Sequence, residues 1–497
     1  MNLSLKLPTP TQAAHLLARA FVCSVLMILP SCMIPNLRQA EGAPETPGNF
    51  VGVSSPENSA KLGVQEFFKD PMLTNLIDLA VLNNRELKAL DEEIEVARNE
   101  YIGRTGAYLP FLNLGAGASL ERTSFFTPAG ALERNVEYMP GRVFPDPIPN
   151  FGLGANFIWQ LDIFRELRNT RDAAQQRYFA AIERRNGFVN RMVAEIAENY
   201  FRLMALDKRM ETIDMTIGLQ EESTKLSKAK MEAGRGTELA VLRFQADVKK
   251  NQSEKLIVTQ EIVEAENRIN FLVNRFPQPV ERNSAAFLDL DLPFSVGVPA
   301  ELLALRPDIR QAEFELQAAG LDILVARAQF FPKLYLRGGV GYQAINTKYL
   351  FLTPEAVVAN VAGDLIAPLI NKVAIQAQYR SANAKQLEAV YNYQRIVLNA
   401  YVEVVNRMTM AENYRRSNDI KRQQLSTLEA SVEAANKLFQ NARVEYIEVL
   451  FVQRDLQEAR LVLIDTKRQQ LAAIVGVYQA LGGGSNLVAP TIEPSRR

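Results

Sequence analysis

The most constraining feature of this chain is an internal repeat. Residues 84–117 and 306–339 align without gaps at an offset of 222 residues. Each copy passes from a charged helical stretch through an aromatic-rich turn to a proline, Pro110 or Pro332, and then to an alternating strand. The identities are few, but the succession of structural types is the same. A duplicated unit of this length predicts a pseudo-symmetric assembly rather than an enzyme built around one asymmetric pocket.

Four segments, two in each copy, alternate with period two between apolar and small or polar side chains. They lie in residues 109–122, 150–162, 332–344 and 356–367. In the first segment, Leu112 and Leu114 share one face, whereas Asn113 and Gly115 share the other. Strands of about 10 residues are long enough for a tilted crossing of an apolar layer about 25 Å thick. The pattern therefore predicts two hairpins of membrane-crossing strands.

A very long helical hairpin follows each strand hairpin. The first is expected over residues 163–276, with a break at Gly234-Arg235-Gly236, and the second over residues 368–482, with a break near residues 441–445. Apolar residues recur in them at steps of three and four, which keeps one apolar seam along each helix and is typical of coiled coils. About seventy helical residues reach about 100 Å. Two such hairpins exceed what one compact domain can cover.

These patterns divide the chain into six parts. We expect a signal peptide, an N-terminal tether, a first repeat, a proline-rich linker, a second repeat and a C-terminal tail, at residues 1–31, 32–69, 70–276, 277–299, 300–484 and 485–497. In the first repeat, a helix over residues 70–106 is expected before the first strand. The predicted fold class is an internally duplicated α+β membrane protein.

The composition excludes several kinds of active site. The only histidine is His15 and the only cysteines are Cys23 and Cys32, so the chain after residue 32 has no imidazole and no thiol. This removes Ser-His-Asp and Cys-His catalysis, as well as thiolate or imidazole metal sites. The 56 basic and 56 acidic residues balance, so no charge excess points to nucleic acid. A glycine-rich phosphate loop is also absent from the sequence. We expect that the protein is not an enzyme and that it binds no cofactor or metal.

The N-terminus has the order of a secretory signal. Lys6 and Arg19 precede a short apolar run at residues 21–29, which is followed by Leu29-Pro30-Ser31-Cys32. The last four residues resemble a bacterial lipobox, which makes Cys32 the expected lipidated, palmitate-bearing first residue of the mature chain. The alternative is an ordinary signal peptide with an incidental cysteine. By resemblance to bacterial lipoproteins, Met33 after the cysteine fits sorting to the outer membrane.

Any membrane crossing after Cys32 must be made by strands, because no later stretch approaches about 18 consecutive apolar residues. Four strands cannot stand alone in lipid, since the backbone groups at their two edges would lack hydrogen-bond partners. The smallest closed barrels of this kind use about 8 strands. Several chains must therefore share one barrel, with their helical hairpins packed into a cylinder beneath it. The patterning leaves two, three or four chains open.

A family resemblance adds to this interpretation. The stretches that carry it, in chain order, are Tyr108-Leu-Pro-Phe-Leu112, Trp159-Gln-Leu-Asp-Ile-Phe-Arg-Glu-Leu-Arg168, Arg306-Pro-Asp-Ile-Arg-Gln-Ala-Glu313, Ala326-Arg-Ala-Gln-Phe-Phe-Pro332 and Tyr478-Gln-Ala-Leu-Gly-Gly-Gly484. With them, the chain resembles the TolC-type outer-membrane efflux proteins, in the lipoprotein branch that serves RND pumps. The resemblance implies a homotrimer in which four strands per chain form a shared β-barrel above a coiled-coil tunnel. It also implies a periplasmic adaptor, an inner-membrane RND transporter and outer-membrane lipid as partners.

The resemblance also implies a gate, because in this family acidic rings narrow the periplasmic end of the tunnel. Glu448 falls where one acidic ring is expected, whereas Phe451 and Ala240 stand where acidic residues are usual. A ring of Phe451 side chains would form a hydrophobic constriction that gates by dewetting. The alternatives are that Phe451 packs in the coiled-coil seam and that Glu448 is only a solvated helix residue.

The two hairpin tips are the expected adaptor contacts. Their residues are Gly234, Arg235, Gly236, Asn441 and Arg443, and the second tip lacks the glycine that is common there in the family. The function expected is a passive outer-membrane exit duct for drugs or other small molecules, with the pump supplying the work. The alternatives are the duct of a type I protein secretion system and, in another class, a lipid-anchored coiled-coil scaffold without a pore.

Overall fold

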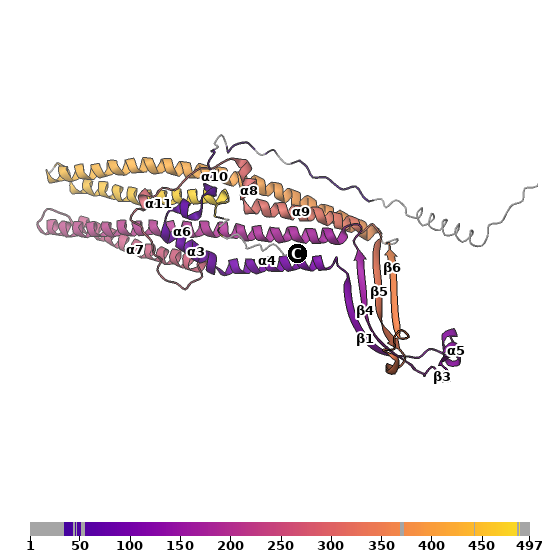
Figure 1. Cartoon of the computed structure of the whole chain (residues 1–497). Coiled ribbons are helices and arrows are strands. Elements are labelled where there is room, and N and C mark those ends of the chain that lie inside the picture. The colour runs from indigo at the N-terminus through magenta and orange to yellow at the C-terminus, as the bar shows by residue number, and fades with distance from the viewer. Residues whose placement is uncertain are drawn as a thin grey trace, which may run out of the picture. The chain divides into compact units, whose positions relative to one another are not determined.

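The computed structural model describes residues 34–42, 45, 47–50, 55–367, 372–441, 443–484 and 487. The chain divides into two compact units. Figure 1 labels the helices and strands. Within the described part of the chain, the first unit falls in the ranges 34–40, Glu100–Ala174 and Ala318–Glu388, and the second in the ranges Glu41–Asn99, Gln175–Gln317 and 389–487. The first unit contains the strands with the adjoining helix ends, and the second contains most of the helical residues. The expected combination of helix and sheet is confirmed.

Two pairs of long helices dominate the helical part. They are α6 (Glu166–Glu232) with α7 (Glu238–Leu272), and α10 (Lys372–Gln440) with α11 (Tyr446–Ala480). The shorter helices are α2 (Val64–Phe68), α3 (Pro71–Asn83), α4 (Arg85–Gly106), α5 (Pro128–Asn135), α8 (Leu302–Leu305) and α9 (Pro307–Ala328). Short 3₁₀ turns are η1 (Ser59–Lys61), η2 (Phe287–Asp289), η3 (Pro299–Glu301) and η4 (Thr347–Tyr349). Among the described helices, none has both the length and the apolar character to cross a membrane.

One antiparallel sheet joins the two copies of the repeat. Its strands are β1 (Phe111–Glu121), β4 (Ile148–Leu161), β5 (Lys333–Ala344) and β6 (Val357–Ile366), in the order β1-β4-β5-β6. The central pairing of β4 with β5 connects the first copy to the second. The long loop between β1 and β4 carries α5 and a small two-stranded sheet, β2 (Glu137–Met139) and β3 (Arg142–Val143). The loop between β5 and β6 is short and carries η4.

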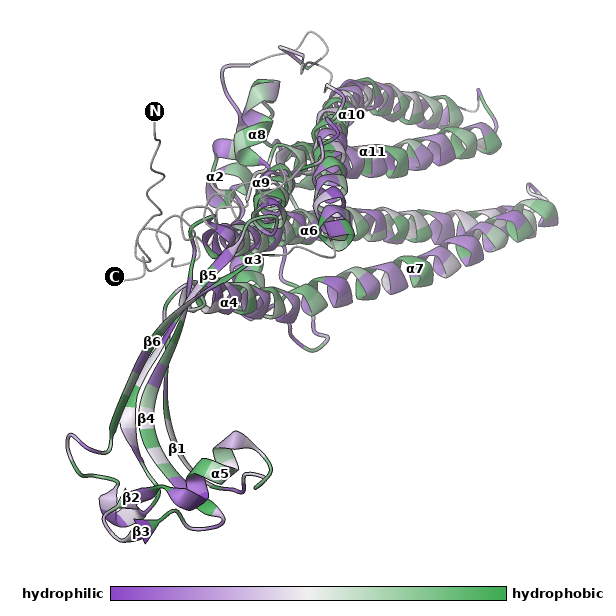
Figure 2. Cartoon of the chain, turned by 90° about the vertical axis from the view of Figure 1, so that its right-hand side faces the viewer, coloured by the Kyte–Doolittle hydropathy of each residue, from purple (hydrophilic) through white to green (hydrophobic). Residues whose placement is uncertain are grey.

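The strand register gives the sheet one apolar face. Leu114 lies opposite Ala155, which lies opposite Val340, which lies opposite Ala359, so the four strands place apolar side chains in one row. Because side chains alternate along a strand, every second residue in each strand continues this face. Figure 2 shows apolar and polar residues alternating along the strands. A slip of one residue would move a whole strand's apolar set to the other side.

The opposite face of the sheet is polar and small. The neighbouring row places Asn113, Asn156, Gly339 and Asn360 across the four strands. On the same face, Arg337 pairs with Asp364 at 2.7 Å, and the Gln343 amide donates to Asn150 Oδ1 at 2.9 Å. The strands approach closely here, since a Cβ added to Gly341 would lie 2.4 Å from the Leu153 carbonyl oxygen. The sheet is therefore amphipathic across its full width.

The helix expected over residues 70–106 is divided into α3 and α4 at Asn84, so this prediction was wrong in one detail. The Asn84 side chain accepts a hydrogen bond from the Leu87 N–H at 2.9 Å, which caps α4, and donates to the Leu272 carbonyl at 2.9 Å. An asparagine at this position favours a break over one continuous helix, because its side-chain oxygen accepts from a free N–H in the first turn of the next helix. The break is fixed by a tertiary contact with the end of α7.

Residues 55–69 differ from a loose tether. Phe67 and Phe68 are fully buried, and the Phe67 ring stacks on Tyr478 with centroids 4.0 Å apart. The Tyr478 hydroxyl donates to the Leu62 carbonyl at 3.1 Å. Asp70, which caps α3, accepts a hydrogen bond from the Tyr200 hydroxyl at 2.9 Å. This segment is part of the core of the helical unit.

Arg306 joins three helices of the second unit. Its guanidinium forms a two-bond contact with Asp308 at 2.9 and 2.7 Å, and it donates to Glu403 at 2.9 Å and to the Ala480 carbonyl at 2.7 Å. The residue is only 7% exposed. Burial acts to lower the pKa of Arg306, but the carboxylates of Asp308 and Glu403 outweigh it and raise the pKa. The start of α9, the middle of α10 and the end of α11 thus meet at one buried charge.

Candidate functional site

The turn between α6 and α7 is the first of the two expected hairpin tips. Gly234 has φ +72°, a left-handed backbone that favours glycine. The Arg235 N–H donates to the Lys230 carbonyl at 2.8 Å, which closes the end of α6. Thr237 then caps α7 by accepting a hydrogen bond from the Ala240 N–H at 3.4 Å. The described tip residues are exposed.

The second tip closes in the same way despite having no glycine. The Arg443 N–H donates to the Leu438 carbonyl at 2.9 Å, the same spacing along the chain as the bond from Arg235 to Lys230. In addition, the Asn441 side chain donates to the Lys437 carbonyl at 2.8 Å. The Asn441 backbone N–H donates to the same carbonyl at 3.2 Å, so Asn441 reinforces the end of α10 with both its backbone and its side chain. The two arginines occupy equivalent places in the two tips.

Phe451 lies outside the apolar seam of its own chain. Its side chain is 42% exposed, whereas Val449, two residues before it, is fully buried. Phe244 of α7 is also buried. Within one chain, the seam near the tips is thus filled by residues other than Phe451.

Two arginines flank the Phe451 ring. The Arg454 guanidinium lies 5.5 Å from the ring centroid and that of Arg243, from α7, lies 5.9 Å from it. Both distances are within the range of cation–π attraction. The contact with Arg243 links α7 of the first copy to α11 of the second. The sequence did not draw attention to these arginines, because the pairing across copies depends on the tertiary structure.

The other two expected gate residues have few distinguishing contacts. Glu448 is exposed, and its N–H donates to the Glu445 carbonyl at 3.1 Å in the first turn of α11. Ala240 is half-buried in the first turn of α7. Their roles at a gate stay predictions. Cys32, the expected lipidation site, lies outside the described residues.

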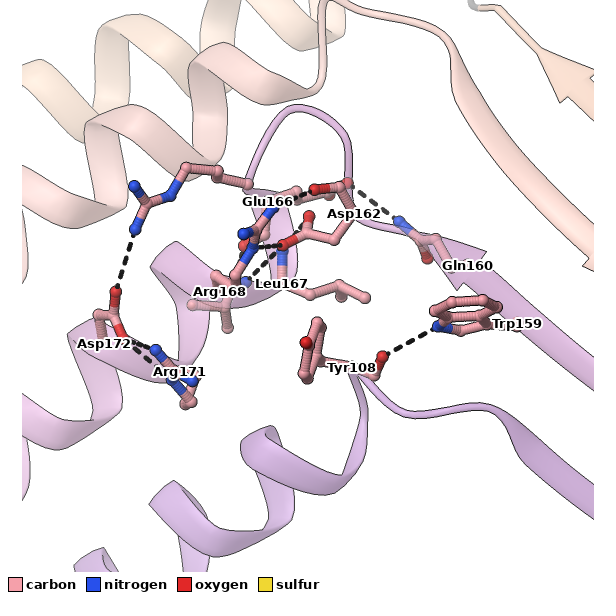
Figure 3. A network of polar contacts seen from close by, with 11 residues as sticks. Tyr108, Trp159, Gln160, Asp162, Glu166, Leu167, Arg168, Arg171 and Asp172 are labelled. Carbon is pink, nitrogen blue, oxygen red and sulfur yellow. Dashed lines mark hydrogen bonds and ion pairs between the residues drawn. The ribbon is translucent and has the colours of Figure 1, made fainter.

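A polar network holds the junction between β4 and α6 (Figure 3). Asp162, whose side chain is 2% exposed, accepts hydrogen bonds from the N–H groups of Leu167 and Arg168, both at 2.9 Å. The Arg168 guanidinium also donates to the Asp162 carboxylate at 3.1 Å and to the Asp162 carbonyl at 2.7 Å. Between β4 and α6 the backbone passes through Arg165, at φ +61°. Asp162 thus caps the first turn of α6 and is itself fixed by Arg168.

Two further contacts tie this junction to its neighbours. The Trp159 indole donates to the Tyr108 carbonyl at 3.1 Å, which connects β4 to the turn before β1. Lys333, at the start of β5, pairs with Glu166 at 2.7 Å. The stretch from Trp159 to Arg168 was noticed in the sequence only as a resemblance. Asp162 lies four residues before α6, whereas the usual cap signal is a polar residue directly before the helix, so the sequence did not indicate this role.

Replacing Asp162 with alanine is expected to destabilise the protein by about 2–3 kcal/mol. The cap alone contributes about 1–2 kcal/mol, and the change also leaves Arg168 without its carboxylate. Thermal or denaturant unfolding of the detergent-solubilised protein measures the loss. Asp162→Asn keeps one acceptor oxygen and should lose about half as much. Equal, negligible losses for both variants would contradict the assignment of the cap.

The fold and the junction define a class of protein, in which an amphipathic four-stranded sheet is combined with paired long helices. Consistent with that class, the chain matches the profile of the outer membrane efflux protein family over residues 76–275 and 298–483. The match covers most of the chain. The chain therefore belongs to the outer membrane efflux protein family.

Individual relatives agree with this assignment. The cation efflux system protein CusC of Escherichia coli K12 is 26% identical over 87% of this chain and 91% of its own. The toluene efflux pump outer membrane protein TtgI of Pseudomonas putida is 25% identical over 92% and 97%, and the probable outer membrane lipoprotein SilC of Salmonella typhimurium is 24% identical over 85% and 88%. A crystal structure of CusC superposes with a TM-score of 0.76 at 25% identity, covering 91% of this chain and 99% of that chain.

The expected function and location are confirmed at the level of the family. The chain is an outer-membrane efflux channel protein, in agreement with the efflux channels among its relatives. The family resemblance noted in the sequence is confirmed as well.

Proposed function

We propose that three copies of this chain form a passive exit duct for small molecules, which a periplasmic adaptor connects to an inner-membrane RND transporter. The sheet carries this proposal. It has one continuous apolar face, and its outer strands β1 and β6 each pair on one side only within the described chain. Unpaired strand edges are not tolerated in lipid, so the edges require further strands. Pairing of β1 in one copy with β6 in the next closes a shared barrel.

The oligomer and the pore are tested together. The purified protein should migrate as a heat-modifiable trimer in detergent and should give single-channel currents in planar bilayers. A monomer that gives no conductance would contradict the proposed duct and favour the scaffold without a pore. Relatives named for cation and toluene efflux support small molecules as cargo rather than secreted proteins. The tip residues Arg235 and Arg443, exposed in equivalent turns, are the proposed adaptor contacts.

The gate proposal centres on Phe451. Its ring is too exposed to be a seam residue of its own chain, and this supports a place on the wall of the tunnel mouth, with Glu448 one turn away on the same helix. Three phenylalanines at one level would narrow the mouth with apolar surface, which resists wetting. Ala240, at the start of α7, lacks the charge that would counter this. The flanking arginines Arg243 and Arg454 attract the ring through cation–π contacts.

Replacing Phe451 with aspartate is expected to raise the resting conductance several-fold and to shift ion selectivity toward cations. The carboxylate hydrates the constriction and adds negative charge to the ring. Single-channel recording in planar bilayers measures both quantities. Val449→Ala, which alters a buried position on the same turn, is the control and should change stability more than conductance. Unchanged conductance and selectivity in Phe451→Asp would place Phe451 in contact with a neighbouring chain instead.

The lipid anchor is the third part of the proposal. Cys32 follows a lipobox-like sequence, and the relative SilC is named a probable outer membrane lipoprotein. Cys32→Ser is expected to abolish labelling of the protein by radioactive palmitate. Cys23→Ser, in the expected signal peptide, is the matched control and should retain the label. Labelling that persists in Cys32→Ser would remove the lipoprotein assignment.

A further inference from the structure

The segment that follows Cys32 is bound to α10. We call residues 34–50 the strap; of these, residues 34–42, 45 and 47–50 are described. The side chain of Asn383 brackets the strap backbone at Arg38: its Oδ1 accepts from the Arg38 N–H at 3.0 Å, and its Nδ2 donates to the Arg38 carbonyl at 3.1 Å. Asn383 is 3% exposed. One buried amide thus satisfies both polar groups of a single strap residue.

Apolar contacts reinforce this bracket. Ile34 and Leu37 of the strap pack against a small cluster of buried residues from α9, α10 and the turn after α9, formed by Ile323, Ala326, Phe330 and Tyr379. The Phe330 and Tyr379 rings meet edge to face with centroids 5.6 Å apart. This cluster is separate from the main helical core. The start of the strap therefore covers a hydrophobic surface of its own.

The later part of the strap is held by the second unit. The Gln394 amide donates to the Glu41 carbonyl at 3.2 Å, and the Tyr401 hydroxyl donates to the Asn49 carbonyl at 3.0 Å. Phe50 is fully buried and stacks on Tyr401 with centroids 5.5 Å apart. Side chains of α10 thus bind strap carbonyls and an aromatic ring as well as Arg38.

The α10 residues that bind the strap share one side of that helix. Asn383, Gln394 and Tyr401 are separated by 11 and 7 residues, which are about three and two helical turns. Residues at these intervals lie in one row. At each of these three places a polar side chain of α10 bonds to a backbone group of the strap. Without the strap, these side chains would be solvated on the helix surface, so together they form a row of binding residues for the strap.

We propose that the strap is a positioning device that ties the lipid anchor to α10, with Asn383 as its positioning residue. The proposal rests on the proposed lipidation of Cys32, which precedes Ile34 by two residues in the sequence. With the strap bound, the acyl chains attach within two residues of the cluster at the end of α9, just before β5 begins. The lipid anchor then restrains α9 and α10 directly, and residues 32–69 do not act as a flexible tether.

Limited proteolysis of the palmitate-labelled, full-length protein in detergent micelles, where trypsin reaches both sides of the channel, tests the strap. Arg38 is the first tryptic site after Cys32, and Lys61 is the next. Cleavage after Arg38 separates the labelled peptide from the channel and leaves a fragment that begins at Gln39, which mass spectrometry distinguishes from one that begins at Leu62. The bracketed Arg38 bond should be cut slowly. Asn383→Leu, which removes both hydrogen bonds, should speed this cut by ten-fold or more, since cleavage follows the population of the open form.

Two further variants serve as controls for this experiment. Asn383→Asp keeps the acceptor for the Arg38 N–H and loses the donor to its carbonyl, so its rate should be intermediate. Lys385→Leu changes an exposed neighbour on α10 and should leave the rate as in the wild type. The thermal unfolding midpoint is recorded for each variant. If the thermal unfolding midpoint of Asn383→Leu is much lower than that of the wild type, the cleavage rates of Asn383→Asp and the wild type are compared instead.

The outcomes separate the strap from the anchor. The docked strap would be contradicted by rapid cleavage after Arg38 in the wild type, or by unchanged cleavage rates in both Asn383 variants. This holds even where the palmitate label is present. Slow cleavage in an unlabelled wild type would remove the lipid anchor and leave the docked strap standing. Slow cleavage of labelled wild type, with acceleration confined to the Asn383 variants, is the result that supports the proposal.

Discussion

Replacing Leu114 with arginine is expected to prevent stable insertion of the protein into the outer membrane. Leu114 is the fourth of the eleven residues of β1 and lies on the apolar face of the sheet, where it is 83% exposed in the single chain. An arginine at mid-membrane on a lipid-facing strand costs about 2–4 kcal/mol per chain, and a trimer would carry three of them. Fractionation of cells into outer-membrane and soluble or aggregated pools measures the loss.

The adjacent residue provides the control for this prediction. Asn113 belongs to the same strand but to the polar face, in a row with Asn156 and Asn360. Asn113→Arg should therefore insert nearly as well as the wild type and should instead alter conductance, because the polar face of a closed barrel lines its pore. Equal insertion of the Leu114 and Asn113 variants would show that the apolar face does not contact lipid.

Arg306→Ala is expected to lower the free energy of unfolding by about 3 kcal/mol. The guanidinium is buried, bonds the carboxylates of Asp308 and Glu403, and satisfies the last-turn carbonyl of Ala480. Removing one partner of a buried charge cluster costs about 3–5 kcal/mol, and partial exposure of Asp308 and Glu403 places the effect near the lower end. Unfolding in denaturant, followed by circular dichroism, provides the measurement.

An exposed ion pair is the matched control for Arg306. Arg416 pairs with Glu412 one turn away on the surface of α10 at 2.7 Å. Exposed pairs of this spacing contribute about 0.3–0.5 kcal/mol, so Arg416→Ala should have little effect. If both alanine variants unfolded alike, Arg306 would not be the point that joins α9, α10 and α11.

Much of the fold follows from local patterns in this sequence. The period-two alternation locates the four long strands, and the three-and-four rhythm locates the paired helices, because both periods reflect backbone geometry. The helix break at Asn84 was missed, since it depends on a bond to Leu272 on another helix. The strap was also missed, because a proline-rich segment without periodicity carries no local signal for the surface that binds it.

The candidate sites divide in the same way. The glycine turn at Gly234 is readable from the sequence, since glycine favours the left-handed backbone found there. The equivalent closure at Arg443 is not, because it forms in a tip whose sequence has no glycine. The arginines around Phe451 come from two copies of the repeat that are distant in sequence. No local pattern indicates such a pairing.

The sequence by itself determined that this chain has two copies of one unit, each with amphipathic strands and long helices. Hydrophobic periodicity is a property of neighbouring residues, so it needs no knowledge of the fold. Only the tertiary structure decided that β4 pairs with β5, and in which register. That pairing joins the copies into one sheet with a single apolar face, because alternation specifies the faces of each strand but not its partner. It likewise decided that Asn383 binds the N-terminal strap and that Arg306 joins three helices, since each contact unites residues far apart along the chain.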